Sequence, residues 1–363
     1  MLRERPHRGV GTGLPLSRRQ AIRRGITAAA GLSAVAGCGR GTAERAGGPL
    51  TIKYWNGFTG PDGKTMEKMV RRFQQDNPDL RVDMQIIPWA QYYDKLTLGI
   101  AFDEGPDLFV VHGSRLQEFA GHEAFLPLDA FQQGPDRVPE EDLVPAALEA
   151  GRFQGRLHGV PLDCHPSGLY YNRRLFREAG IVDARGEARP PTTLKEFLDA
   201  AHRMTKEVDG QRQWGFGFTW LPYNFYTFAY QHGGSSLTPD LKRSAMDSQE
   251  TIRALEQMRG LVTVEKVAPP PESTDSWIGF RQGRVAMAFH GIFMLADLEA
   301  TGELDFAGAP LPRMGPAGRV FGGSHMLCMP ARIRPARARA AWRLLRYLSD
   351  HSLDWAEGGQ VPV

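Results

Sequence analysis

One stretch of the sequence, in which strand and helix patterns alternate, constrains the fold most. Apolar and polar residues alternate over residues 50–55 and again over 81–87, and a short apolar run covers residues 108–111. Apolar residues at helical spacing separate these stretches, first over residues 66–73 and then after Trp89. Strands joined through helices lie parallel in one sheet, because such connections are right-handed crossovers. The sequence therefore predicts an α/β fold that begins with a parallel sheet.

The N-terminal part has the pattern of an export signal rather than of a folded domain. Seven Arg residues and a single acid, Glu4, precede a weakly apolar run over residues 26–37. A basic region followed by a short apolar region and small residues is typical of secretion signals, and this run is too short to span a membrane. Residues 17–22 are similar to a twin-arginine signal, with Ala21 where Phe is usual. We therefore predict that residues 1–37 are removed on export.

The residue that follows this signal is a cysteine. Residues 35–38, Val-Ala-Gly-Cys, are similar to a lipobox, in which the Cys thiol receives a lipid and becomes the new N-terminus. More than one acyl chain holds a protein at a membrane stably. The alternative is an ordinary secretion signal in which Cys38 is incidental. We expect a protein of the cell envelope or periplasm that is anchored through Cys38, with residues 38–49 as a tether rich in small and charged residues.

Removal of the signal changes the sign of the net charge. The whole chain has 44 Lys and Arg against 41 Asp and Glu, and residues 1–37 contain 7 and 1 of these. The rest of the chain therefore has 37 basic and 40 acidic residues, a formal charge of −3. Because the basic character of the chain belongs to the predicted signal, the composition gives no support to nucleic-acid binding.

The remaining sequence mixes helix and strand patterns and is long enough for two lobes. The spacing of apolar residues predicts a helix after Pro191, a strand over residues 285–289 and an amphipathic helix over 338–348. About 315 residues remain after the tether, and one domain usually takes about 100–200 residues. Two further thiols, Cys164 and Cys328, permit one disulfide, which an oxidising compartment allows but does not require.

Short motifs follow one another in a fixed order along this part of the chain. The most specific run is Gly159-Val160-Pro161, Tyr171-Asn172, Leu175-Phe176, Ala179-Gly180 and Pro191-Thr192-Thr193. The motifs around it are Tyr54-Trp55-Asn56-Gly57, Gly105-Pro106-Asp107-Leu108-Phe109 with Ser114-Arg115, Trp214-Gly215-Phe216, Ala286-Met287-Ala288 with Gly291, Gly322-Gly323 and the helix that carries Trp342. In order and spacing the set resembles the extracellular solute-binding proteins of carbohydrate ABC importers, which include the maltodextrin-binding proteins.

The resemblance implies a periplasmic-binding-protein-like α/β fold with two lobes and a ligand cleft between them. It assigns residues 50–162 to the first lobe, 163–310 to the second lobe, 311–350 to a return into the first lobe and 351–363 to the start of a second-lobe tail. Family members usually continue with further helices, so this tail is expected to be truncated. The lobes of such a receptor close on the ligand and open to release it. We expect a monomer without a cofactor that delivers a carbohydrate to an ABC permease.

Candidate ligand contacts follow from the chemistry of sugars and from the resemblance. A sugar offers apolar C–H faces and a rim of hydroxyls, so its site needs flat aromatic rings and polar groups that make directed hydrogen bonds. The resemblance places His165 where maltodextrin-binding members have a ligand-binding carboxylate, Tyr223 on a stacking aromatic and Phe293 where many members have a stacking Trp. Ligand contacts are therefore expected from Trp55, Asn56, Trp89, Ser114, Arg115, Asp163, His165, Trp220, Tyr223, Trp277, Gly291, Phe293 and Gly323.

Several of these residues have a structural interpretation as well. Trp55 and Trp89 are equally compatible with packing in the first lobe, and Trp277 with packing on its own helix. Asp163 could instead be a hydrogen-bonding residue of the hinge. A lone histidine such as His165 often serves structure rather than binding.

Other classes of function are less compatible with the sequence. A ferric-ion receptor could use the pairs Tyr92-Tyr93 and Tyr170-Tyr171, but neighbouring residues of a strand point to opposite faces, and the sequence has no H-x-x-x-H motif or Cys cluster. A glycosidase needs two carboxylates across a sugar site, and nothing in the sequence pairs two acids in this way. A polyamine or amino-acid receptor of the same fold is the nearest alternative. We expect no enzymatic activity and no metal site.

Overall fold

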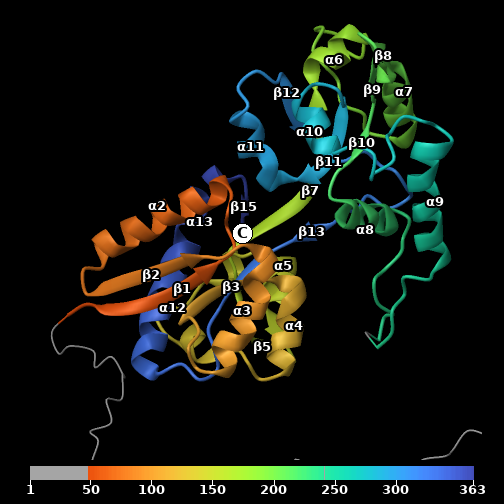
Figure 1. Ribbon diagram of the computed structural model, residues 1–363. Coiled ribbons are helices and arrows are strands. Elements are labelled where there is room, and N and C mark those ends of the chain that lie inside the picture. Colours follow the sequence, from red (N-terminus) through yellow and green to blue (C-terminus); the bar gives the residue numbers. More distant parts are fainter. Residues whose placement is uncertain (1–47, 241) are drawn as a thin grey trace, which may run out of the picture. The chain divides into compact units, whose positions relative to one another are not determined.

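The computed structural model describes residues 48–240 and 242–363, which form two α/β lobes (Figure 1). The predicted export signal, the lipobox with Cys38 and nearly all of the tether lie outside the described residues. Among the described helices, none combines the length and the apolar character that crossing a membrane requires.

The first lobe is built on a five-stranded sheet with the order β2-β1-β3-β14-β6. The strands are β1 (Leu50–Asn56), β2 (Leu80–Ile86), β3 (Leu108–His112), β6 (Val160–Pro161) and β14 (His325–Cys328). β1 pairs in parallel with β2 and β3, as the alternating pattern predicts. β14 pairs antiparallel with β3 and β6, so a segment from late in the chain completes this sheet.

Amphipathic helices close the core of the first lobe. They are α2 (Pro61–Asp76), α3 (Trp89–Ala101), α4 (Gly113–Gly121), α5 (Pro145–Ala150) and α12 (Pro335–Asp350), with 3-10 turns η1 (Asp129–Gln133) and η2 (Glu140–Asp142) and a hairpin of β4 (Arg152–Phe153) and β5 (Arg156–Leu157). α2 buries the apolar face that its spacing predicts, with Met66, Met69, Val70 and Phe73. α12 does the same with Ala341, Trp342, Leu345 and Leu348. The predictions for these two helices are confirmed.

The second lobe is built on a sheet with the order β10-β11-β7-β12, in which β7 also pairs with β13 and β15. The strands are β7 (Asp163–Asn172), β10 (Gly217–Phe218), β11 (Met287–Gly291), β12 (Phe306–Ala309), β13 (Gly322–Gly323) and β15 (Val361–Pro362). β7 has ten residues, and its first half pairs with β15 and β13 while its second half pairs with β11 and β12. One long strand therefore connects the edge of the first lobe with the centre of the second.

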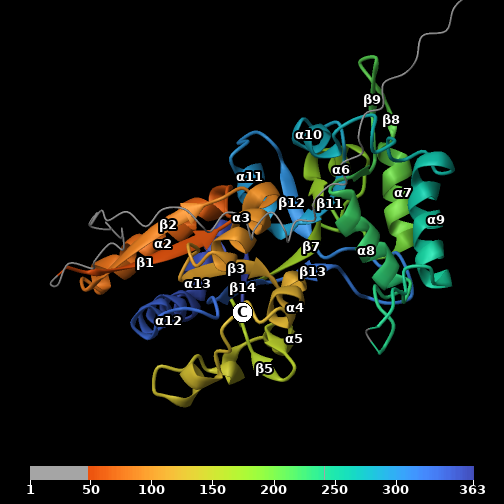
Figure 2. The same ribbon diagram turned by 60° about the horizontal axis from the view of Figure 1, so that its bottom comes forward.

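The second lobe contains helices, most of which begin at a side chain that caps them. They are α6 (Arg173–Glu178), α7 (Leu194–Met204), α8 (Leu221–Gln231), α9 (Gln249–Thr263), α10 (Ser276–Arg281) and α11 (Leu295–Glu299), with the turn η3 (Ile292–Met294) and a hairpin of β8 (Lys206–Val208) and β9 (Gln211–Gln213). Thr193 accepts a hydrogen bond from the backbone N–H of Glu196, and Ser248 caps α9 in the same way. α7, α8 and α9 contribute to one buried core, and α8 lies beside α9 (Figure 2).

The structure differs from the sequence expectation for residues 351–363. α13 (Ser352–Trp355) and η4 (Ala356–Gly358) pack against α2 of the first lobe, and only β15 pairs with β7. The physical reason is Trp355, whose side chain is fully buried in the core of the first lobe. The two thiols for which a disulfide was left open, Cys164 and Cys328, are free.

Candidate functional site

A cavity of about 710 Å³ lies in the second lobe, and aromatic side chains form much of its wall. Three of them, Trp220, Trp277 and Phe293, are among the ligand contacts that the sequence predicts. They come from the start of α8, from α10 and from the turn η3. The full lining is Phe218, Thr219, Trp220, Leu221, Pro271, Glu272, Ser273, Thr274, Asp275, Ser276, Trp277, His290, Phe293 and Met294.

The backbone holds Trp220 in an unusual conformation at the rim of this cavity. Its φ is 32°, in the left-handed region that bulky residues rarely adopt, and 48% of its surface is exposed. Its ring lies edge-on to the ring of Phe293, with centroids 5.4 Å apart, and 4.2 Å from the ring of Tyr223. Strain of this kind persists only where the surrounding structure supports it, and it is common at ligand sites.

Hydrogen bonds hold both the backbone and the indole ring of Trp277. The carboxylate of Asp275 accepts hydrogen bonds from the backbone N–H groups of Trp277 and Ile278, which caps α10. The indole Nε1 donates to Asp297 at 3.1 Å. These hydrogen bonds keep the indole next to the imidazole of His290, and the two ring centroids are 4.6 Å apart.

His290 is the polar group between these rings, and the sequence does not single it out. Its Nδ1 accepts a hydrogen bond from the backbone N–H of Gly291 at 2.8 Å, so in the neutral ring Nε2 carries the proton and is a donor. Burial lowers the pKa of His290 to about 4, so the ring is neutral at physiological pH. An aromatic wall with a neutral imidazole donor suits a ligand that combines apolar faces with hydroxyl groups.

The lowered pKa of His290 predicts a pH dependence of stability. Between the unfolded value of 6.5 and the folded value of about 4, the unfolded chain binds a proton that the folded protein does not, so stability falls as the pH falls through this window. We expect wild type to lose about 2 kcal/mol more than His290→Asn between about pH 7 and about pH 5. Asn keeps an acceptor for Gly291 but does not titrate. Urea unfolding of both proteins at both pH values measures the difference. Equal losses of stability in wild type and His290→Asn would contradict the lowered pKa of His290.

A second cluster of polar side chains lies where the first sheet meets β7. Asp163, the first residue of β7, is fully buried. Its carboxylate accepts hydrogen bonds from Nδ1 of His165 at 3.0 Å, from the backbone N–H and Nδ1 of His325 at 3.0 and 2.8 Å, and from Nε1 of Trp355 at 2.8 Å. Burial alone would raise the pKa of Asp163, but His325 and the hydrogen bond from His165 lower it well below the ordinary value.

Of the residues for which the sequence predicts ligand contact, Trp55, Asn56, Asp163, His165 and Gly291 are buried in the structure. Trp55 is 5% exposed and packs in the first lobe, and the side chain of Asn56 is fully buried and accepts a hydrogen bond from the backbone N–H of Phe58. The carboxylate of Asp163 is occupied by its four protein donors. The side chains of Trp55, Asn56 and Asp163 are therefore enclosed by protein in this structure.

The remaining predicted contacts lie near one of the two clusters or on the surface. The ring of Trp89 is half-buried and parallel to that of His325, with centroids 5.7 Å apart. Ser114 is exposed at the start of α4, and Arg115 lies over the ring of Tyr93. Tyr223 and Gly291 border the aromatic cavity without lining it, and His165 and Gly323 belong to the polar cluster.

Gly323 is required by the close approach of His165. A Cβ at this position would lie 2.1 Å from Nε2 of His165, far inside van der Waals contact. We expect Gly323→Ala to lower the free energy of unfolding by about 1–3 kcal/mol, because overpacking displaces the ring. Gly308→Ala is the matched control, since it lies in a strand with nothing within 4 Å of its Cβ, and should cost less than about 0.5 kcal/mol. Urea unfolding of both variants measures this, and equal effects would contradict the steric argument.

Comparisons with known proteins agree with the fold. The family model "Bacterial extracellular solute-binding protein" matches residues 58–351. The sn-glycerol-3-phosphate-binding periplasmic protein UgpB of Escherichia coli K12 is 23% identical over 336 residues, which is 86% of this chain and 74% of UgpB.

Two solved structures have a similar fold. One is a solute-binding protein of Thermotoga lettingae bound with α-D-tagatose, with a TM-score of 0.72 and 25% identity over 86% of this chain and 81% of that one. The other is the cyclic α-maltosyl-1,6-maltose binding protein of Arthrobacter globiformis, with a TM-score of 0.70 and 25% identity over 87% and 80%. Since the family model covers most of the chain, the protein belongs to the bacterial extracellular solute-binding protein family and is a non-enzymatic receptor of an ABC importer.

Proposed function

We propose that this receptor is a lipoprotein that binds a neutral sugar or oligosaccharide in the aromatic cavity of the second lobe. The observation that carries the proposal is the composition of the cavity wall. The cavity is lined by the aromatic rings of Trp220, Trp277 and Phe293 and by the neutral imidazole of His290. Its lining residues include no Lys or Arg.

This wall fits the two kinds of surface that a sugar presents. Aromatic rings stack on the C–H faces, and hydroxyl or carboxylate oxygens such as those of Ser273, Thr274 and Glu272 accept hydrogen bonds from sugar hydroxyls. Ligand sites typically measure about 300–1,000 Å³, so the volume accommodates a mono- or oligosaccharide. One protein of similar fold was solved with α-D-tagatose bound and another is named for binding cyclic α-maltosyl-1,6-maltose, which supports the same class of ligand.

A phosphate ester fits the wall less well. UgpB of Escherichia coli is named for binding sn-glycerol-3-phosphate. A phosphate group is usually held by Arg or Lys, often in bidentate geometry. Because the cavity wall provides neither and contains the acids Glu272 and Asp275, it would repel a dianion.

An organic cation is the second candidate, and the same two acids favour it. Aromatic rings attract ammonium groups by cation–π interactions, and carboxylates pair with them. Glu272 is exposed, however, and Asp275 already accepts two backbone hydrogen bonds as the cap of α10. We therefore favour the sugar.

Ligand binding would lead to import in two ways. The two lobes close on the ligand, and the lipid anchor keeps the receptor at the membrane. The expected division of the chain into residues 50–162, 163–310 and 311–350 leaves Trp89, Ser114 and Arg115 on the first lobe, where they can meet a ligand held by the second. A ligand shifts closure only by its higher affinity for the closed form. A lipid on Cys38 would keep the monomeric receptor beside the permease that accepts the closed form.

Thermal unfolding of the purified chain against a ligand panel tests the proposal. The panel contains mono- and oligosaccharides, spermidine, glycerophosphodiesters, glycerol 3-phosphate and Fe³⁺. A ligand at about 100 times its Kd adds about 2.7 kcal/mol to stability, which is a clear shift in Tm. We expect a shift with at least one sugar. A shift with spermidine alone would favour the cation, and a shift with glycerol 3-phosphate or Fe³⁺ alone would overturn the sugar assignment.

A further inference from the structure

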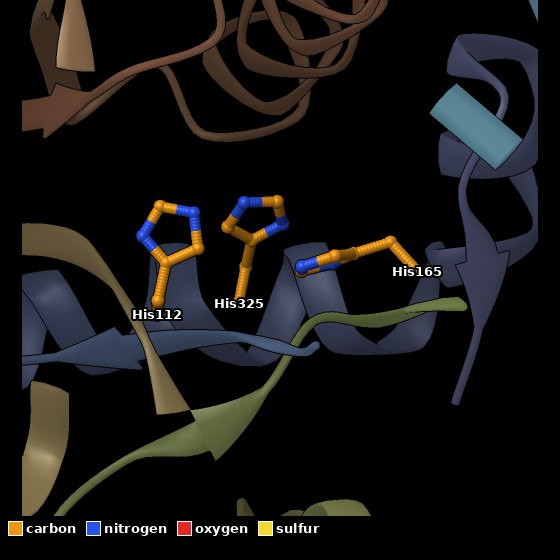
Figure 3. A group of neighbouring side chains, drawn as sticks. All are labelled: His112, His165 and His325. Atoms are coloured by element: carbon orange, nitrogen blue, oxygen red, sulfur yellow. The ribbon is translucent and has the colours of Figure 1, made fainter. Parts of the chain in front are cut away.

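Three histidines from separate strands meet beside the buried Asp163. His112 ends β3, His165 lies near the start of β7 and His325 begins β14, and one ring nitrogen of each lies within 4.8 Å of the others (Figure 3). His112 and His325 are direct partners in the antiparallel pairing of β3 with β14, so their side chains share one face of the sheet. His165 joins them because Gly323, opposite it on β13, has no side chain.

Each of the three rings is held through Nδ1, which leaves Nε2 for a ligand. Asp163 binds Nδ1 of His165 and Nδ1 of His325, one with each carboxylate oxygen. Nδ1 of His112 lies 2.6 Å from the hydroxyl of Tyr93. Histidines that bind metals are usually oriented in this way, with the second nitrogen donating to a carboxylate or another oxygen.

The donor atoms of this cluster determine which class of metal ion it could bind. A neutral imidazole is the form that coordinates a metal. Both oxygens of Asp163 are already occupied, so the donor set consists of imidazoles, which suit Zn²⁺, Ni²⁺ and Cu²⁺ rather than Mg²⁺ or Ca²⁺.

We propose that Nε2 of His112, His165 and His325 bind one divalent transition-metal ion of the zinc class. Zinc–nitrogen bonds of about 2.0–2.1 Å place tetrahedral ligand atoms about 3.4 Å apart, so the rings close in by small side-chain rotations. The ion ties β3 and β14 of the first sheet to β7, which continues into the second. His165 also contacts Phe293 of the aromatic cavity, with ring centroids 6.2 Å apart. The ion thus stabilises the junction of the two lobes beside the ligand cavity, and the proposal does not depend on which solute the receptor carries.

Calorimetric titration of the chelator-treated full chain with Zn²⁺ tests this site, and Co²⁺ serves as a spectroscopic substitute. We expect one high-affinity ion per chain and the visible absorption of tetrahedral Co²⁺. His112→Ala should weaken Zn²⁺ binding by at least about 100-fold and abolish this absorption, because it removes one of three ligands. Tyr93→Phe should weaken binding about 10- to 100-fold, since it removes only the partner of Nδ1.

A control histidine separates this site from incidental binding. His232 is half-buried and hydrogen-bonded to Gln257 in the second lobe, so His232→Ala should leave the Zn²⁺ affinity and the Co²⁺ spectrum unchanged. If His112→Ala fails to fold without metal, the weaker Zn²⁺ binding expected of Tyr93→Phe becomes the test of the site. Equal Zn²⁺ affinity of wild type and Tyr93→Phe, or a Co²⁺ spectrum without tetrahedral absorption, would overturn the proposal.

Discussion

Replacement of Asp163 by alanine is expected to lower the free energy of unfolding by about 3–5 kcal/mol. The carboxylate is fully buried and accepts four hydrogen bonds, from His165, twice from His325 and from Trp355. Alanine leaves the backbone N–H of His325 and the indole N–H of Trp355 without an acceptor, and each such buried group costs about 1–3 kcal/mol.

Chemical denaturation of Asp163→Ala measures this effect, and Asp79→Ala is its control. Asp79 also pairs with a basic partner, Arg343, but its side chain is 60% exposed. A solvent-exposed ion pair contributes little to stability, so the control should lose much less than Asp163→Ala. If both variants lost the same small amount, the hydrogen bonds to Asp163 would not stabilise the junction between the sheets.

Replacement of Trp355 by alanine is expected to be as severe, with a loss of about 3–5 kcal/mol. The indole is fully buried, its ring centroid is 4.7 Å from that of Phe58, and its Nε1 donates to Asp163. The variant therefore creates a cavity in the core of the first lobe and removes one donor from the buried carboxylate. Urea unfolding measures the loss.

Trp220→Ala is the matched control for Trp355, since 48% of Trp220 is exposed, and it should cost less than about 1 kcal/mol. The double variant of Asp163 and Trp355 should be less unstable than the sum of the single variants, by about 0.5–3 kcal/mol, because the two side chains share a hydrogen bond. Strict additivity would show that the side chains of Asp163 and Trp355 do not stabilise each other. A Trp355→Ala variant as stable as wild type would show that the indole is not needed in the core of the first lobe.

The sequence predicts those parts of the fold that depend on local periodicity. The parallel arrangement of β1, β2 and β3 and the buried faces of α2 and α12 follow from residue spacing alone, because each element buries one side. The motifs also identify the family. The placement of α13 does not follow from any local pattern, since it depends on the fit of one indole, that of Trp355, into a core assembled from distant segments.

The candidate site is predictable only in part. Trp220, Trp277 and Phe293 can be found from aromatic residues beside loops and from the resemblance. Trp55 and Asn56 lie in a family motif as well, but the sequence does not reveal that their side chains point into the core. The histidine cluster escapes a motif search, because His112 and His325 are 213 positions apart in the sequence and become neighbours only through the pairing of β3 with β14.

Calorimetric titration of wild type and Trp220→Ala with the sugar found by thermal unfolding decides whether the aromatic cavity is the ligand site. Trp214→Ala is the control, since Trp214 belongs to the same lobe but does not line the cavity. Loss of a stacking ring should weaken the affinity of Trp220→Ala on the order of 10- to 100-fold, which corresponds to about 1.4–2.7 kcal/mol, while Trp214→Ala binds like wild type. Equal affinity of wild type and Trp220→Ala, with both proteins folded, would contradict the assignment of the cavity.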